Sequence, residues 1–97
     1  MPTYISLIKY TTQGIQNMKE SPTRLGRAKE IAQANGGELT AFYLTMGGYD
    51  AVVMSEYPSD EAAAKALLTI GRAGAVQTET LRAFTEDEYR KLVDSLP

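Results

Sequence analysis

The chain of 97 residues contains no cysteine and no histidine. The absence of cysteine excludes disulfide bonds, thiolate nucleophiles and thiolate-ligated metals. The absence of histidine removes the commonest general base near neutral pH and the commonest ligand of transition metals. A zinc or iron site would have to use carboxylates alone, so the sequence predicts no metal site and no cofactor.

Strong charge and long hydrophobic runs are also missing. The net charge is −2, and 43% hydrophobic residues is ordinary for one folded domain, which we expect to span 1–97. Because a mildly acidic chain does not attract polyanions, nucleic acid is not an expected partner. No stretch approaches the roughly 20 apolar residues of a membrane span. The first residues do not resemble a signal peptide, so we expect no membrane partner and a cytoplasmic location.

The sequence pattern divides the chain into strands and helices. Strands rich in β-branched and aromatic residues are predicted over 3–10, 38–44, 49–57 and 75–84. Helices are predicted within 11–20, from Ser21-Pro22 to Gly36, from Ser59 or Asp60 to Gly74, and after Thr85. Thr85 and Glu88 have the spacing of a capping box, which marks the start of the last helix.

This order of elements defines the fold class. Strand-helix-strand-strand-helix-strand is the ferredoxin-like α+β plan, and this chain adds a C-terminal helix. The plan predicts a four-stranded antiparallel sheet, with the first and third strands at its centre and the second and fourth at its edges. The composition agrees, because the segments YISLI and DAVVM are the most apolar and the fourth strand is the most polar.

Two helices can cover only one face of such a sheet. The first strand presents apolar residues to both faces, and in the third strand Ala51 and Val53 oppose Val52 and Met54. A large exposed apolar patch on a small protein usually marks an interface. We therefore expect a second copy to cover the open face, giving a homodimer or higher oligomer. The competing solution is that the C-terminal helix docks across that face.

Several segments resemble one known family. Four parts of the sequence are similar to those of the GYD domain family: the tripeptide Gly48-Tyr49-Asp50, the longer stretch ELTAFYLTMGGYDAVVM, the serine and aspartate that start the helix ending at Gly74, and the segment QTETLRAF. The resemblance covers nearly the whole chain. It implies a ferredoxin-like domain of the dimeric α+β barrel type. It implies no reaction, because the family is essentially of unknown function.

The segment around the tripeptide is the candidate site. In one interpretation Gly47 and Gly48 make a tight hairpin turn, Tyr49 packs over it and Asp50 accepts backbone hydrogen bonds. In the other, Asp50 faces a pocket as a base or ligand contact, with Tyr43 and Tyr49 as neighbouring phenols. The turn interpretation is favoured, and Asp50 is a weak catalytic candidate.

Other residues fit structural roles better than functional ones. The candidates to bind an anionic ligand are Arg24, Arg27, Arg72 and Arg82. Arg24 and Arg27 are instead expected to be solvated on a helix, and Arg82 is expected to pair with an acidic neighbour. The segment GRAG, 71–74, is best explained as a helix end because it lacks the lysine of a phosphate-binding loop. An RNA-binding sheet is disfavoured because the third strand has no aromatic residues where they would stack on bases.

Two functional hypotheses follow. The first is a self-associating small-molecule-binding or accessory protein without its own redox centre. The second is a cofactor-independent enzyme, an oxygenase or isomerase of a small hydrophobic or aromatic substrate, on a dimeric α+β barrel. An enzyme needs a pocket that encloses Asp50 or a tyrosine with room for substrate. In a purely structural module, side chains would fill that space.

Overall fold

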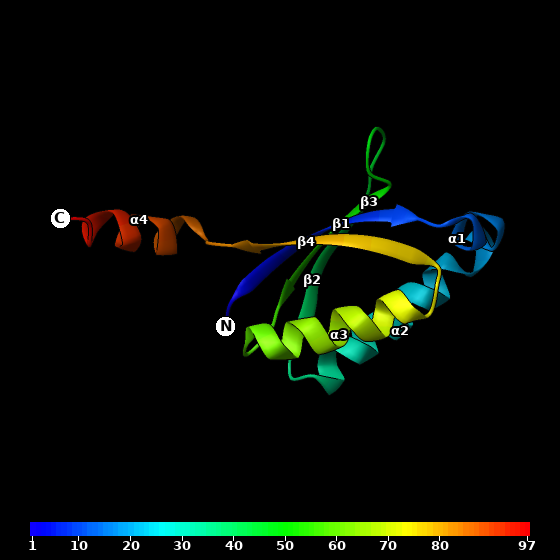
Figure 1. Cartoon of the computed structure of the whole chain (residues 1–97), viewed down its shortest axis with the longest axis horizontal. Helices are drawn as coiled ribbons and strands as arrows, with labels where there is room; N and C mark the ends of the chain where they lie inside the picture. Colours follow the sequence, from blue (N-terminus) through cyan, green and yellow to red (C-terminus); the bar gives the residue numbers. More distant parts are fainter.

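The computed structural model describes residues 1–97 as a single sheet with helices on one side (Figure 1). The elements are β1 (Thr3–Tyr10), α1 (Thr12–Gln16), the 3-10 turn η1 (Met18–Glu20), α2 (Ser21–Ala34), β2 (Glu38–Leu44), β3 (Ala51–Glu56), α3 (Asp60–Arg72), β4 (Val76–Ala83) and α4 (Glu86–Asp94). This order confirms the predicted ferredoxin-like plan, including the two helical pieces that meet at Ser21.

The sheet has the strand order β2-β3-β1-β4, and every neighbouring pair is antiparallel. The predicted placement of β1 and β3 at the centre is therefore confirmed. The third strand is shorter than predicted, because Tyr49 and Asp50 belong to the hairpin turn. In that turn the Thr45 N–H donates to the Asp50 carbonyl over 2.9 Å.

Local capping explains where the helices begin and end. The Ser59 hydroxyl accepts the Ala62 N–H at the start of α3, and Thr85 and Glu88 form both hydrogen bonds of the predicted capping box at α4. Gly36 and Gly74, with φ of 78° and 89°, supply the left-handed residues that follow α2 and α3. Ser21 is the first residue of α2 and not its cap.

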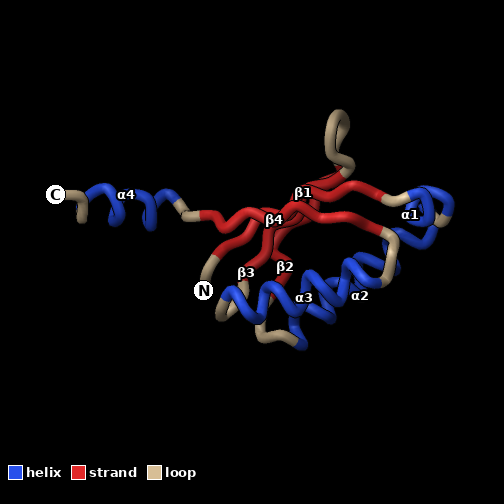
Figure 2. The backbone as a smooth tube through the Cα atoms, viewed as in Figure 1, coloured by secondary structure: helices blue, strands red, loops and turns tan.

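Helices α2 and α3 lie side by side across one face of the sheet (Figures 1 and 2). At one end of this helix–sheet layer, Tyr4, Tyr57 and three alanines are almost fully buried; the alanines are Ala32, Ala63 and Ala66. The Tyr4 and Tyr57 rings meet edge to face with centroids 5.8 Å apart. We call these five residues the packed end. Alanine side chains let the helices approach the sheet closely there.

The opposite face of the sheet is not covered by any element of the chain. Helix α4 continues from β4 away from the body, so its tail does not fold back over the sheet (Figure 1). This projection stretches the molecule to 52 Å and gives a radius of gyration of 14.6 Å, above the roughly 13 Å of a compact chain of this length. Docking of the C-terminal helix on its own sheet, the competing prediction, is wrong.

Candidate functional site

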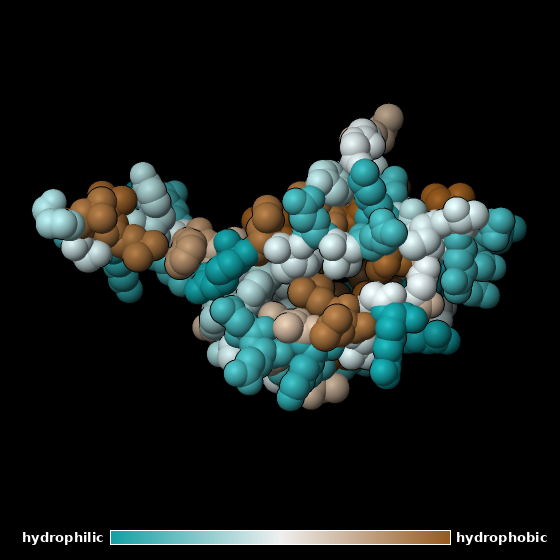
Figure 3. All heavy atoms as spheres, in the orientation of Figure 1, coloured by the Kyte–Doolittle hydropathy of each residue, from teal (hydrophilic) through white to brown (hydrophobic).

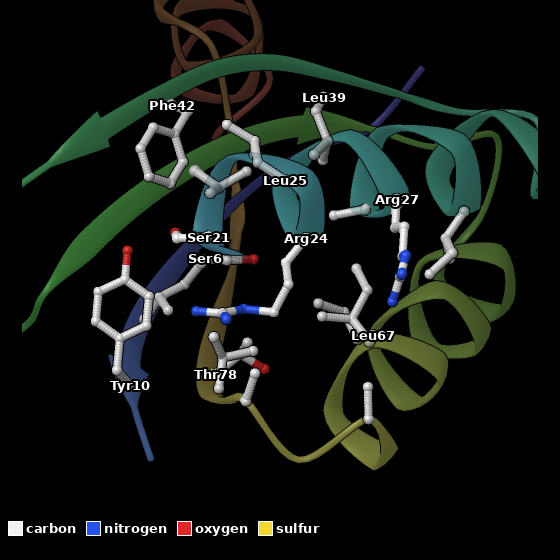
Figure 4. Close-up of a pocket in the computed structure, with 18 of the residues that line it drawn as sticks. Ser6, Tyr10, Ser21, Arg24, Leu25, Arg27, Leu39, Phe42, Leu67 and Thr78 are labelled. Atoms are coloured by element: carbon white, nitrogen blue, oxygen red, sulfur yellow. The ribbon is translucent and has the colours of Figure 1, made fainter. Parts of the chain in front are cut away.

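A cavity of about 270 Å³ lies between the sheet and the helices, beyond the buried alanines of the packed end. Figure 4 shows side chains from β1, β2, β4, α2 and α3 pointing into it. Five of the residues that line the cavity define what we call the hollow end of the layer; they are Ile8, Tyr10, Arg24, Phe42 and Thr78. Most of the lining is hydrophobic, and Figure 3 shows apolar side chains gathered between the sheet and α3.

At the hollow end, the segment before α2 is held by hydrogen bonds to backbone carbonyls of the segment that leads into β4. The Thr11 hydroxyl donates to the Gly74 carbonyl over 2.6 Å, and the Thr11 N–H donates to the Ala75 carbonyl over 3.0 Å. Gly14 lies so close to Ala75 that an added Cβ would be 2.1 Å from the carbonyl oxygen. The chain before α2 is therefore attached to the start of β4, next to the cavity.

Arg24 is a partly buried, charged residue in the lining of the cavity. Its Nη1 donates to the Asn17 carbonyl over 2.8 Å and its Nη2 to the Gly14 carbonyl over 3.3 Å. The side chain is partly buried, so the prediction that Arg24 is solvated is wrong. Arg27 also lines the cavity but is exposed, as expected. Figure 4 shows Arg24 extending from α2 in the direction of Tyr10.

Hydroxyl groups add polar contacts to the apolar walls. Ser6 and Thr80, on neighbouring strands, share a hydrogen bond of 2.8 Å beneath the cavity. Tyr10 and Tyr57 also line it. Burial raises the pKa of the Tyr57 hydroxyl above its ordinary value near 10, so this phenol stays protonated at neutral pH. The hydroxyls can orient a bound molecule.

The predicted site residues lie outside this cavity. The Asp50 carboxylate accepts the Tyr10 N–H over 2.9 Å, and the Asp50 N–H donates to the Ile8 carbonyl over 2.8 Å. Asp50 thus fastens the hairpin to β1, which is the geometry of the turn interpretation. Gly47 has the positive φ, 116°, whereas Gly48 does not. A role for Asp50 in ligand binding or catalysis stays a prediction.

The two predicted phenols belong to the helix-free face. The Tyr49 hydroxyl donates to a Glu79 carboxylate oxygen, and the Lys9 ammonium lies 5.5 Å from the Tyr49 ring centroid. The hydrogen bond to Glu79, more than its charge, raises the pKa of Tyr49. Tyr43, on edge strand β2, is 59% exposed. Their roles as ligand contacts stay predictions, and they do not share one pocket with Tyr10 and Arg24.

The helix-free face carries a row of apolar side chains. Strand register pairs Leu7 with Val52, and Ile5 with both Met54 and Leu81. Side chains opposite one another in register point to the same face. These five side chains are partly exposed, and Leu81 is 46% exposed. We call them the open-face cluster.

Arg82 does not form the ion pair that the sequence predicted for it. Arg82 was expected to pair with an acidic residue, but its guanidinium carbon lies 4.5 Å from the Phe84 ring centroid and 5.9 Å from that of Tyr4. It also donates to the Ala83 carbonyl. The one ion pair in the chain is Arg90–Glu86 on α4. The expectation of an Arg82 ion pair is wrong, because the aromatic rings on either side supply its contacts.

No cluster of three or more acidic side chains could hold a metal ion, and no helix is both long and apolar enough to cross a membrane.

The fold and cavity define a ferredoxin-like α+β domain with a hollow helix–sheet layer. The GYD domain family model matches residues 4–93, and the chain belongs to this family.

Relatives and solved structures agree with this assignment. The chain is 32% identical to the "glutamine synthetase and cystathionine beta-lyase binding protein" of Thermus thermophilus over 84 residues, 86% of this chain and 88% of the relative. The crystal structure of TTHA0845, also from Thermus thermophilus, has a TM-score of 0.55 at 22% identity, covering 88% of this chain and 95% of that one.

A leucine response regulatory protein, LrpA, of Mycobacterium tuberculosis has a TM-score of 0.61 at 21% identity. The alignment covers 89% of this chain but only 54% of LrpA, so this chain spans about half of that protein. At these identities, both structural likenesses show the fold alone.

Sequence reasoning missed the cavity, and it favoured a solvated Arg24 over an anion-binding one. The signal was present in part, because Leu25, Ala28 and Ile31 mark the buried side of α2 and Arg24 adjoins that stripe. What helical spacing does not give is the distance between α2 and the sheet. An arginine at the edge of a buried stripe becomes a cavity residue only where the layer below it is hollow.

Proposed function

We propose that this protein is a self-associating accessory protein that binds other molecules and does not catalyse a reaction. The observation that carries the proposal is the helix-free sheet face, where the open-face cluster stays uncovered by the chain's own elements. A second copy covers this face, and the assembled protein has its cavity available for a small organic molecule. A cytoplasmic place of action stays a prediction from the sequence.

The chemistry of the helix-free face fits a second copy of the same chain. Its apolar centre would contribute roughly 25 cal/mol for each Å² buried. The helix-free face also carries both signs of charge, with Lys9 on the central strand β1 and Glu79 on the edge strand β4. In a two-fold dimer each surface meets its own copy, so the cation of one protomer can approach the carboxylate of the other. The face is therefore complementary to itself.

Helix α4 is a second uncovered surface. Its first turn is acidic, and its apolar residues are all exposed. These side chains are Tyr89, Leu92 and Val93, and Leu96, just after the helix, is exposed as well. Figure 3 shows hydrophobic side chains gathered on the projecting arm. A projecting amphipathic helix adds apolar contact area that an assembled form can bury.

An accessory role is supported by the curated relative. Its name describes a protein that binds glutamine synthetase and cystathionine β-lyase. We propose that this chain likewise acts by binding another protein. The enzyme alternative meets one of its requirements, because Tyr10 and Tyr57 line the cavity. Its carboxylate candidate does not lie there, since Glu20 is the one carboxylate of the lining and Asp50 is engaged in the hairpin.

The test of self-association is sedimentation velocity with light scattering at micromolar concentration. We expect a dimer or higher oligomer for the wild-type chain. Leu7→Glu places a charge in the open-face cluster, and we expect it to weaken association by at least ~30-fold, as for a central interface residue. Leu68→Glu is the matched control, because Leu68 is 72% exposed on α3 and should leave association unchanged.

Two results would contradict the proposal. One is a strictly monomeric wild-type chain. The other is an oligomer that Leu7→Glu leaves intact while circular dichroism shows an unchanged fold. For the accessory role, the measurement is co-purification of the chain with metabolic enzymes from its own cell extract, compared between the wild-type chain and a variant lacking residues 85–97.

A further inference from the structure

We propose that the cavity between the sheet and helices α2 and α3 binds a small monocarboxylate with an apolar body, and that Arg24 holds its carboxylate. The inference rests on the small-molecule part of the proposed function, and it does not require self-association. It assigns a ligand class and a recognition residue to a cavity whose lining is mostly hydrophobic.

The size of the cavity limits the ligand. Its volume is about 270 Å³. Since an apolar cavity of roughly 150 Å³ accommodates benzene, this space corresponds to on the order of ten heavy atoms. That is enough for a phenyl ring with a short side chain or a medium-length aliphatic chain, and too little for a nucleotide or a folded peptide.

The walls determine the chemistry of the ligand body. Phe42 on β2, Ile8 on β1, and Leu67 and Ile70 on α3 all line the cavity. Apolar walls of this kind bind hydrocarbon by removing it from water, at roughly 25 cal/mol for each Å² covered. A polar body such as a sugar would replace fewer of its hydrogen bonds to water, because most of the lining is hydrophobic. The ligand body is therefore hydrocarbon.

The charge of Arg24 determines the head group. The guanidinium is partly buried, and its hydrogen-bond partners are the backbone carbonyls of Asn17 and Gly14. No carboxylate lies within ion-pair distance, since the one ion pair of the chain is Arg90–Glu86. A guanidinium has five N–H donors, so donors remain for a ligand. A carboxylate provides the matching planar acceptor and the missing negative charge.

The surroundings of Arg24 favour one negative charge on the ligand. Arg27 lines the same cavity but is exposed to solvent, while Glu20 contributes a carboxylate to the lining. The Arg24 cation is thus the one partly buried charge available. Figure 4 shows the Ser21 and Tyr10 side chains from α2 and β1 on the Arg24 side of the cavity. Their hydroxyls add hydrogen-bond donors to the lining of the cavity that a carboxylate can accept.

The first experiment is titration of the full chain with cinnamate and octanoate, and with cinnamamide and octanamide as neutral matches. Amide chemical shifts report the place of binding, and calorimetry reports the affinity. We expect the carboxylates to shift the signals of Ser6, Arg24 and Thr78, and to leave Tyr43 and Tyr49 unchanged. We expect carboxylates to bind at least tenfold more tightly than their amides.

Variants separate the charge from the cavity. Arg24→Leu should reduce carboxylate affinity at least tenfold and change amide affinity little, whereas Arg24→Lys should retain part of the preference. Arg72→Leu is the matched control, because Arg72 lies in the last turn of α3 and does not line the cavity. Since Arg24 also bonds two carbonyls, a second variant, Ala28→Leu, narrows the cavity from α2 and should weaken binding of every probe.

The inference is overturned if no probe shifts cavity signals at millimolar concentration. It is also overturned if carboxylates and amides bind alike, or if Ala28→Leu leaves binding intact. These failures differ from failure of the proposed function. An oligomer that binds no probe contradicts the ligand assignment alone, and a monomer that binds carboxylates contradicts self-association alone.

Discussion

The packed end and the hollow end of the helix–sheet layer both involve strand β1 and helices α2 and α3. They differ in what fills the space between the sheet and the helices. At the packed end, Tyr4 and Tyr57 are 5% and 1% exposed, and the facing helix positions are alanines. At the hollow end, Tyr10 and Phe42 are only partly buried around a cavity of about 270 Å³. The fold is stabilised at one end and leaves room for a ligand at the other.

The largest expected effect comes from removing a ring at the packed end. Tyr57→Ala should lower the free energy of unfolding by about 3–5 kcal/mol, as other buried aromatic deletions do. Phe42→Ala at the hollow end should cost less than half of that, because the Phe42 side chain is only partly buried whereas Tyr57 is 1% exposed. Urea denaturation of both variants measures the difference. Equal losses would show that the two ends are packed alike.

Enlarging an alanine in each region sharpens the same comparison. Ala66 is 0% exposed, so Ala66→Leu has no free volume and should destabilise the fold by about 1–3 kcal/mol. Ala28 lines the cavity, and Ala28→Leu should change stability by less than about 1 kcal/mol in either direction. Thermal unfolding compares the two. A larger loss for Ala28→Leu would mean that the cavity closes in solution.

The buried phenols make the packed end sensitive to alkali. Burial raises the pKa of Tyr4 and Tyr57, and the hydrogen bond from Tyr4 to Asp60 raises that of Tyr4 further. Above about pH 10 the unfolded chain releases these protons first, so stability is intact below about pH 10 and falls as pH rises. Urea titrations from neutral to alkaline pH should show this decline. The Tyr4→Phe, Tyr57→Phe double variant should decline less; an identical slope would assign the effect to other groups.

The smallest effect concerns α4, which lies outside both ends. Thr85→Ala removes its cap and should cost that helix about 1 kcal/mol, seen in its backbone chemical shifts. The unfolding midpoint of the dilute chain should not move, because α4 projects from the body. Ser59→Ala removes the matching cap of α3, which packs on the sheet, and should lower the midpoint. A lowered midpoint for Thr85→Ala would show that α4 docks.

Much of the fold was predictable because its signals are local. Ser59, Thr85 and Gly36 mark helix ends through hydrogen bonds or φ angles within a few residues. The placement of β1 and β3 at the sheet centre followed from the ferredoxin-like order of elements, and the apolar composition of both strands agreed with it. The start of β3 was wrong by two residues, because the bond between Thr45 and Asp50 extends the turn.

The candidate site was less predictable, because its parts are distant in sequence. The sequence drew attention to Tyr43, Tyr49 and Asp50 as a group on one hairpin. In the structure Asp50 bonds the backbone of Tyr10, and Tyr49 reaches across to Glu79. Arg24 comes from a helix whose arginines were expected to be solvated. None of these partners lies near enough along the chain for spacing to indicate it.

By itself, the sequence determined the order of elements, the central strands, the family and the surplus of apolar residues on the sheet, since periodicity and capping act over a few residues. Only the tertiary structure decided that α4 projects, that Asp50 fastens the hairpin, and that a cavity with Arg24 at its side separates α2 and α3 from the sheet. The reason is physical. A void depends on how far apart two layers are held. That distance is set by contacts such as Gly14 against Ala75 and Ala66 against the sheet. The residues in these contacts are distant in sequence and meet only when the chain folds.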